Sequence, residues 1–160
     1  MTDATALVGL LRQRGETVGC AESLTGGLVC ATLVAVPGAS QVVRGAIVAY
    51  APDLKTSLLG VDGQLLATSG TVAAATAEAM ARGAAERLGA TYGLATTGVA
   101  GPDPSEGKPA GTVHVAVAGP GGVQARLMRL RGDRETVRRS SVTAVLELLT
   151  DLLGDPTGDR

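Results

Sequence analysis

The 160-residue sequence is poor in aromatic side chains: it has no tryptophan or phenylalanine and only two tyrosines, Tyr50 and Tyr92. Nucleic-acid-binding proteins usually combine a basic patch with aromatic rings on which bases stack. The net charge here is −1, so the composition offers neither feature. We therefore expect no nucleic-acid partner, and a core built from many small contacts between alanine, valine and leucine.

Histidine and cysteine are also scarce. His114 is the single histidine, and Cys20 and Cys30 are too far apart for a CxxC pair. These residues do not make a typical zinc site, so we expect no bound metal. They also exclude a Ser-His-Asp triad unless His114 itself takes part. The two cysteines are interpreted as reduced packing residues.

Long apolar runs are missing as well. No stretch reaches the roughly 18 residues that a membrane-spanning helix needs. The first residues carry Asp3 and an amphipathic pattern, and they lack the basic and then apolar regions of a signal peptide. The expected location is the cytoplasm, with no membrane partner.

What the sequence does contain is a regular alternation of strand and helix patterns. We expect helices at residues 3–14, 25–34, 52–60, 71–88 and 133–153, and strands at 17–20, 41–50, 91–97, 111–118 and 123–130. Asp3 or Thr2, Thr71 and Asp133 are the expected caps of three helices. The last two strands flank a glycine-rich turn and predict a hairpin. The order predicts a single three-layer α/β/α domain, with a mixed sheet flanked by helices.

The segment 21–27 follows the first predicted strand and contains Ser23 before Gly26 and Gly27. A serine on a tight strand-to-helix turn presents its hydroxyl beside backbone N–H groups, which can hold an oxyanion or a phosphate. The alternative is an ordinary helix cap formed by Ser23 or Thr25. The spacing by itself leaves both interpretations open.

The segment after the second predicted strand contains Tyr50 and Lys55. The chain has 12 arginines and only two lysines, Lys55 and Lys108, which suggests that each lysine has a special position. A buried lysine with a lowered pKa can act as the general base for a serine nucleophile. The alternatives are a solvated lysine on a helix and a tyrosine that only packs.

A third loop runs from residue 98 to residue 109, after the strand that ends with Thr96 and Thr97. Its glycines allow a ligand to approach the backbone, and its hydroxyl groups can orient polar atoms. The alternative is a long surface loop. All three loops fall where open α/β sheets bind ligands, at strand ends beside helix starts.

These motifs, in this order, resemble those of the CinA C-terminal domain family, whose best-known activity is nicotinamide mononucleotide deamidation (the PncC-type amidohydrolases). The resemblance extends from about Leu7 to Leu153. The matching segments are Ala21-Glu22-Ser23-Leu24-Thr25-Gly26-Gly27, Arg44-Gly45 with Tyr50 and Lys55, Leu59-Gly60-Val61, Met80-Ala81-Arg82-Gly83-Ala84, Thr97-Gly98-Val99-Ala100-Gly101-Pro102-Asp103, Lys108-Pro109-Ala110-Gly111-Thr112-Val113, and Gly132-Asp133-Arg134 with Val137-Arg138.

The resemblance implies a role for each matching residue. Ser23 would be the nucleophile, Lys55 its base, and Tyr50 an assisting residue. Arg138 would bind the substrate phosphate, because arginine suits bidentate phosphate recognition. The expected pocket residues are Thr25, Gly26, Gly27, Thr97, Gly98 and Gly101.

The implied reaction is hydrolysis of the carboxamide of nicotinamide mononucleotide to nicotinate mononucleotide and ammonia, in pyridine nucleotide salvage and NAD metabolism. It needs no metal or cofactor. Residues 1–153 would form the amidohydrolase domain, residues 154–160 a frayed tail, and the protein a homo-oligomer, with a dimer favoured. The alternatives are a non-catalytic nucleotide-binding or competence-related module, and a Ser–Lys hydrolase of another small amide.

Three positions depart from the family pattern. Leu24 replaces the usual cysteine after the serine, Ala51 replaces a serine after the tyrosine, and Pro104-Ser105 replaces two glycines. None of these changes removes Ser23 or Lys55. We therefore expect them to affect the shape of the pocket and the affinity for substrate more than the type of reaction.

Overall fold

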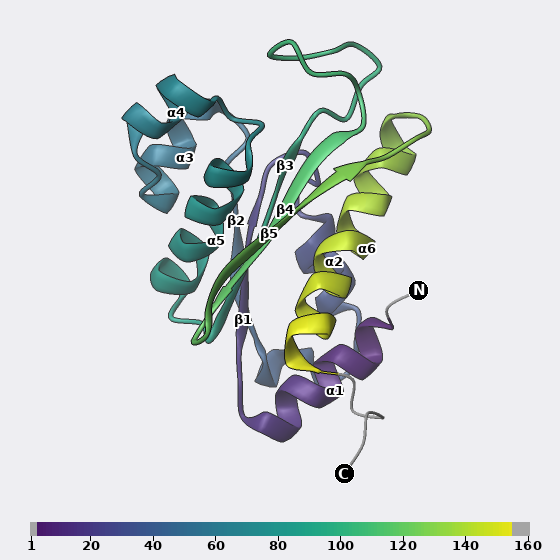
Figure 1. Ribbon diagram of the computed structural model, residues 1–160. Coiled ribbons are helices and arrows are strands. Elements are labelled where there is room, and N and C mark those ends of the chain that lie inside the picture. Colours follow the sequence, from purple (N-terminus) through teal and green to yellow (C-terminus); the bar gives the residue numbers. More distant parts are fainter. Residues whose placement is uncertain (1–2, 155–160) are drawn as a thin grey trace.

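A five-stranded sheet runs through the middle of the protein, between two layers of helices (Figure 1). The computed structural model describes residues 3–154. The strands lie in the order β2-β1-β3-β4-β5, with β1, β2 and β3 parallel and β4 and β5 antiparallel to their neighbours. Their bounds are β1 Val18–Glu22, β2 Val43–Val48, β3 Tyr92–Gly98, β4 Thr112–Gly119 and β5 Gly122–Arg129. The predicted single three-layer α/β domain, its mixed sheet and its hairpin are confirmed.

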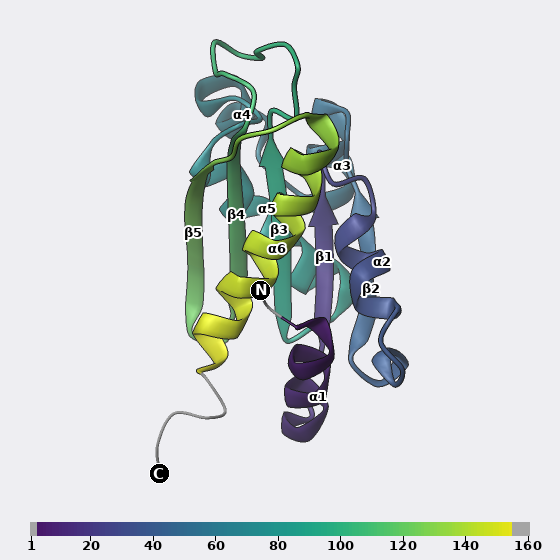
Figure 2. The same ribbon diagram turned by 90° about the vertical axis from the view of Figure 1, so that its right-hand side faces the viewer.

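Six α-helices cover the sheet within the described residues. Three lie on one face: α1 Ala4–Arg14, α2 Leu28–Val34 and α6 Arg134–Leu153. The other face carries α3 Pro52–Leu59, α4 Gly63–Ser69 and α5 Ala74–Leu88. A 3₁₀ turn, Ala39–Gln41, precedes β2. Figure 2 shows α6 and α2 extended along their face of the sheet.

Two of the three predicted helix caps are confirmed. The carboxylate of Asp3 accepts a hydrogen bond from the Thr5 N–H, and the carboxylate of Asp133 accepts one from the Thr136 N–H. The prediction for Thr71 is wrong. Helix α5 begins only at Ala74, and the Thr71 hydroxyl donates instead to Glu106 Oε1 at 2.6 Å.

The other differences lie at element boundaries. Helix α2 begins at Leu28 and not near Thr25, because Gly26 and Gly27 adopt φ of +57° and +104° and form a turn. Strand β1 extends to Glu22, so Ser23 follows directly at its carboxyl end. The short helix α4 was not predicted.

The two faces of the sheet are packed differently. The face under α1, α2 and α6 is filled mainly by leucine and valine, whereas the face under α3 and α5 is mostly alanine. A Cβ atom on Gly93 of β3 would lie 2.0 Å from the Ala81 carbonyl oxygen, and one on Gly83 of α5 would lie 2.1 Å from the Leu59 carbonyl oxygen. These glycines therefore allow α5 to pack close to the sheet and α3 close to α5, which fixes the helix that carries Lys55.

At the carboxyl end of the chain, helix α6 is followed by Gly154. The predicted tail otherwise lies outside the described residues. Between residues 3 and 154, no helix is long and apolar enough to cross a membrane.

Candidate active site

The three predicted loops come together at the carboxyl edge of β1, β2 and β3, around a pocket of about 360 Å³. This volume is in the usual range for sites that bind small molecules. The pocket is lined from four places: the turn after β1, the β2–α3 segment, the loop after β3, and the connection between α4 and α5. Arg134, the first residue of α6, adds a fifth contribution.

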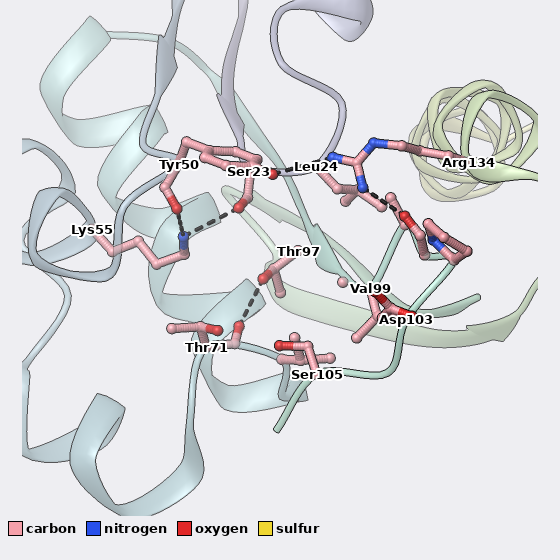
Figure 3. A pocket seen from close by; sticks show the side chains of 15 residues that line it. Ser23, Leu24, Tyr50, Lys55, Thr71, Thr97, Val99, Asp103, Ser105 and Arg134 are labelled. Carbon is pink, nitrogen blue, oxygen red and sulfur yellow. Dashed lines mark hydrogen bonds between the residues drawn. The ribbon is translucent and has the colours of Figure 1, made fainter. Parts of the chain in front are cut away.

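Ser23 and Lys55 meet at the bottom of this pocket (Figure 3). Lys55 Nζ lies 3.2 Å from Ser23 Oγ, and the Lys55 side chain is only 1% exposed. The same nitrogen donates to the Ala49 carbonyl oxygen at 2.8 Å and to the Tyr50 carbonyl oxygen at 3.4 Å. The contact that the sequence predicted between the two side chains is therefore present.

Burial lowers the pKa of Lys55 below its ordinary value, because desolvation disfavours the ammonium form. The charge of Glu106 acts in the opposite direction and raises this pKa. Glu22 directly precedes Ser23, but its carboxylate is turned toward the first turn of α2. Burial therefore shifts the equilibrium of Lys55 toward the neutral amine that a general base requires, and Glu106 opposes this shift.

The turn between β1 and α2 is held by Glu22, and neither Ser23 nor Thr25 caps the helix. The buried Glu22 carboxylate accepts hydrogen bonds from the N–H groups of Gly27, Val29 and Cys30 at 3.2, 2.9 and 3.1 Å. Because a buried carboxylate satisfies these donors, the Ser23 hydroxyl needs no capping role and can face the pocket.

Thr25, Gly26 and Gly27 were expected to line the pocket, but the structure places them behind it. The Thr25 hydroxyl is buried against Thr96 Oγ1 at 2.8 Å. The Gly26 N–H donates to the Ser23 carbonyl oxygen, and the Gly27 N–H donates to Glu22. These N–H groups are therefore not available to a ligand. Leu24, which follows Ser23, does line the pocket.

The loop after β3 forms one side of the pocket, as expected: Thr97, Gly98 and Gly101 all line it. Thr71 and Val72 in the α4–α5 connection, which the sequence analysis did not identify, line the pocket beside this loop (Figure 3). The two segments are joined, because the Thr97 hydroxyl donates to the Thr71 carbonyl oxygen at 2.7 Å.

The arginine in the pocket is Arg134 and not Arg138. Arg138 donates to the carbonyl oxygens of Leu24 and Thr25 at 2.8 and 3.1 Å, so it supports the serine turn from behind. Arg134 donates to the Gly101 carbonyl oxygen at 2.7 Å and to the Tyr50 hydroxyl at 3.3 Å, across the pocket from Lys55 (Figure 3). Its position directly after the cap Asp133, at the start of a helix, is the sequence signal that could have identified it.

The side chains that bind metals most often do not gather at the site. His114 lies on β4 opposite Thr97 and does not line the pocket. Cys20 is buried and Cys30 is half-buried, and both are free thiols. Within residues 3–154, no three His, Cys, Asp or Glu residues form a group that could hold a metal ion.

The fold and the site define a three-layer α/β protein with a serine–lysine pair at the carboxyl edge of its parallel strands. The family model of the CinA C-terminal domain matches residues 2–153. The chain therefore belongs to the CinA C-terminal domain family, as its motifs suggested.

Named relatives agree with this assignment. A CinA-like protein of Frankia casuarinae is 54% identical over 147 residues, which cover 92% of this chain and 34% of that protein. A second, from Gloeobacter violaceus, is 50% identical over 152 residues, covering 92% and 35%. The chain thus spans about a third of the length of the curated relatives it matches.

Solved structures show the same fold. A competence-damaged protein (CinA) superfamily protein of Escherichia coli superposes with a TM-score of 0.90 at 33% identity, covering 93% of this chain and 87% of that one. A competence/damage inducible protein of Agrobacterium tumefaciens gives a TM-score of 0.89 at 38% identity, with 94% and 92% covered.

Proposed function

We propose that this chain hydrolyses the carboxamide of nicotinamide mononucleotide to nicotinate mononucleotide and ammonia, through an acyl-enzyme on Ser23. The observation that carries the proposal is the buried Lys55 amine, 3.2 Å from the Ser23 hydroxyl, at the bottom of a pocket open to a small ligand. The family resemblance supplies the substrate.

The hydrogen-bond partners of Lys55 suit a base that gains and loses a proton. A neutral amine has two hydrogens and one lone pair. The two hydrogens match the carbonyl oxygens of Ala49 and Tyr50, and the lone pair then accepts the Ser23 hydroxyl proton. The ammonium form, with three hydrogens, keeps all three partners. Both protonation states are therefore accommodated without movement of the chain.

In the proposed reaction, Ser23 Oγ attacks the amide carbon while Lys55 Nζ takes the hydroxyl proton. The tetrahedral intermediate collapses, its C–N bond breaks, and the Lys55 ammonium gives its proton to the leaving nitrogen, which departs as ammonia. Water then attacks the acyl-enzyme, again with Lys55 as base. This step releases the carboxylic acid and restores Ser23.

The oxyanion needs hydrogen-bond donors close to Ser23. The N–H groups of Gly26 and Gly27 are already bonded, and Thr25 is buried outside the pocket lining. We therefore assign this role to the N–H of Leu24, which follows Ser23 in the pocket lining. Within residues 3–154 no other group accepts a hydrogen bond from it.

The charges around the pocket match those of the substrate. Nicotinamide mononucleotide has a cationic pyridinium ring and an anionic phosphate. Arg134 offers a guanidinium group to the phosphate, and Asp103 offers a carboxylate on the same side of the pocket. Arg134 therefore takes the phosphate-binding role that the sequence analysis gave to Arg138.

The deciding experiment incubates the purified protein with nicotinamide mononucleotide and measures ammonia and nicotinate mononucleotide together. Ser23→Ala is the matched control, because it removes one oxygen from a turn that Glu22 holds. The assay is repeated with EDTA, which we expect to have no effect, and with nicotinamide riboside, which lacks the phosphate. We expect both products from the parent protein and none from the Ser23→Ala variant.

The other outcomes separate the alternatives. Binding of the nucleotide without release of ammonia would indicate a non-catalytic nucleotide-binding module. Release of ammonia only from a different amide would indicate a Ser–Lys hydrolase with another substrate. Full activity in a folded Ser23→Ala protein would remove Ser23 from the mechanism.

A further inference from the structure

The loop after β3 ends in a tight two-residue turn that contains an unexpected residue. Ser105 and Lys108 exchange backbone hydrogen bonds of 3.0 and 2.9 Å, and between them Glu106 and Gly107 have φ of +53° and +71°. Turns with positive φ at both central positions favour glycine, asparagine and aspartate. Within residues 3–154, Glu106 is the single non-glycine residue with positive φ, so its side chain must compensate for this conformation.

The Glu106 carboxylate spans the pocket rim to the α4–α5 connection. It accepts hydrogen bonds from the N–H and hydroxyl of Thr71 at 3.0 and 2.6 Å and from the N–H of Val72 at 3.1 Å. A Cβ atom on Gly70, which has φ of +80°, would lie 2.7 Å from Glu106 Oε2. The segment is thus shaped to receive this carboxylate.

The carbonyl groups of the same segment are bound from the same side. Lys108 Nζ donates to the Val72 carbonyl oxygen, and the Thr97 hydroxyl donates to the Thr71 carbonyl oxygen. Each backbone N–H and C=O of Thr71 and Val72 therefore has its partner on the β3 strand or the loop that follows it. We call these two residues the threonine wall of the pocket.

We propose that Glu106 is a positioning residue for the Ser23–Lys55 pair, an inference that rests on the proposed function. Its carboxylate fixes the threonine wall, which lines the same pocket as Ser23 and Lys55. Glu106 does not itself line the pocket, so its effect is exerted through Thr71 and Val72, which do.

The negative charge of Glu106 also affects the pKa of Lys55. Lys55 must take a proton from Ser23 and then give one to the departing nitrogen, which works best when its pKa is near the working pH. Burial lowers that pKa, and the charge of Glu106 raises it again. Glu106 therefore counteracts the effect of burial on the pKa of Lys55.

Other titratable residues line the same pocket as Lys55. They are Tyr50 just before α3, Asp103 on the loop after β3, and Arg134 on α6. Glu106, on the turn beside them, is the charge that raises the pKa of Lys55. Replacement of Glu106 is thus the cleanest test.

Three variants distinguish the effect of the charge of Glu106 from the effect of its side-chain length. Glu106→Gln removes the charge with little change in size. Glu106→Asp keeps the charge but is one methylene shorter, and aspartate suits the turn. Glu106→Gly removes the whole side chain and relieves the positive φ, so it should fold at least as well as the parent.

Two measurements need neither substrate nor activity. Amide hydrogen exchange of Thr71 and Val72 measures how firmly the threonine wall is held. A titration followed by ¹³Cε-lysine NMR measures the pKa of Lys55. The chain has only two lysines, so a Lys108→Arg sample assigns both signals. In Glu106→Gln and Glu106→Gly we expect exchange at least about tenfold faster, from loss of charge-assisted hydrogen bonds, and a lower titration midpoint for Lys55. In Glu106→Asp only the exchange should change strongly.

Parent-like exchange of Thr71 and Val72 together with an unchanged Lys55 midpoint in Glu106→Gln would overturn the proposal. If the parent protein also releases ammonia, the acid limb of its kcat/KM profile should move to lower pH in Glu106→Gln, in step with Lys55. A parent protein that releases no ammonia would contradict the proposed function, while the exchange and the titration would still decide the role of Glu106.

Discussion

Two sides of the pocket are held by glutamates in different surroundings. On the serine side, Glu22 is 0% exposed and accepts three backbone N–H bonds from the start of α2. On the threonine wall, Glu106 is exposed at a loop tip and accepts two N–H bonds and one hydroxyl bond from Thr71 and Val72. Both carboxylates hold a segment through hydrogen bonds from its backbone N–H groups, and the two glutamates differ in burial.

Because Glu22 is buried and Glu106 is exposed, the two glutamates differ in how costly they are to replace. A buried carboxylate with its donors satisfied is costly to disturb, because removing it leaves unpaired N–H groups away from water. An exposed one can be replaced at a smaller cost, since water substitutes for it. The nucleophile is thus placed by the core, while the facing wall and the charge near Lys55 depend on a surface residue.

The largest expected effect tests whether Lys55, which lies between the two sides, serves Ser23 as a base. Lys55→Arg should lower turnover almost as much as Lys55→Ala, by roughly 100-fold or more, because a guanidinium group stays protonated and cannot accept the serine proton. Steady-state release of ammonia, measured beside thermal melts of both variants, checks this. Substantial activity in Lys55→Arg would mean that the lysine acts as a fixed positive charge.

The next effect compares the two glutamates directly. Glu22→Gln should lower the free energy of unfolding by about 3 kcal/mol, because the amide cannot satisfy all three buried N–H donors and places its own NH₂ group among them. Glu106→Gln should cost about 1 kcal/mol or less, since Glu106 is itself exposed to water. Urea unfolding of both variants at neutral pH measures the difference.

Equal losses in the two variants would contradict the comparison. So would a larger loss in Glu106→Gln, since it would show that the threonine wall is the more rigid side. Glu135→Gln, an exposed replacement at the start of α6, controls for the loss of one negative charge.

Much of this arrangement could be predicted from the sequence. Hydrophobic periodicity and glycine-containing turns located the sheet and most of the helices, and the motifs brought Ser23, Lys55 and the loop after β3 to one edge. The meeting of these loops at one edge follows because parallel strands present their carboxyl ends together. Sequence patterns were sufficient to predict those elements whose stabilising contacts are between residues close in the sequence.

What could not be predicted depends on contacts between distant residues. Thr71 fits the pattern of a helix cap, yet its hydroxyl is bound by Glu106, 35 residues away. Glu22 lies beyond the strand predicted at residues 17–20, yet it ends β1 and its carboxylate binds the first turn of α2. Arg134 and Arg138 lie one turn apart on the same helix, and only tertiary packing decides which one reaches the pocket.

The smallest expected effect concerns the stability of the pocket at different pH values. The pKa of Lys55 is lower in the folded protein than its ordinary value of 10.5, because of burial. Between these two pKa values the unfolded chain binds more protons than the folded one, so stability rises with pH across that window. Below the folded pKa the full cost of keeping an ammonium group buried is present.

Lys55→Met lacks this cost, although it leaves the carbonyl oxygens of Ala49 and Tyr50 without their donor. The stability of Lys55→Met relative to the parent should therefore be highest at low pH and decline toward pH 10.5, by about 1.4 kcal/mol for each unit of pKa difference. Urea unfolding at several pH values measures this, with Lys108→Met as the control for loss of a lysine. If the difference in the free energy of unfolding between Lys55→Met and the parent did not change with pH, burial would not lower the pKa of Lys55. Introduced into the parent protein, Glu106→Gln should lower the pKa of Lys55 further. The pH range between the folded and unfolded pKa values of Lys55 should then be wider.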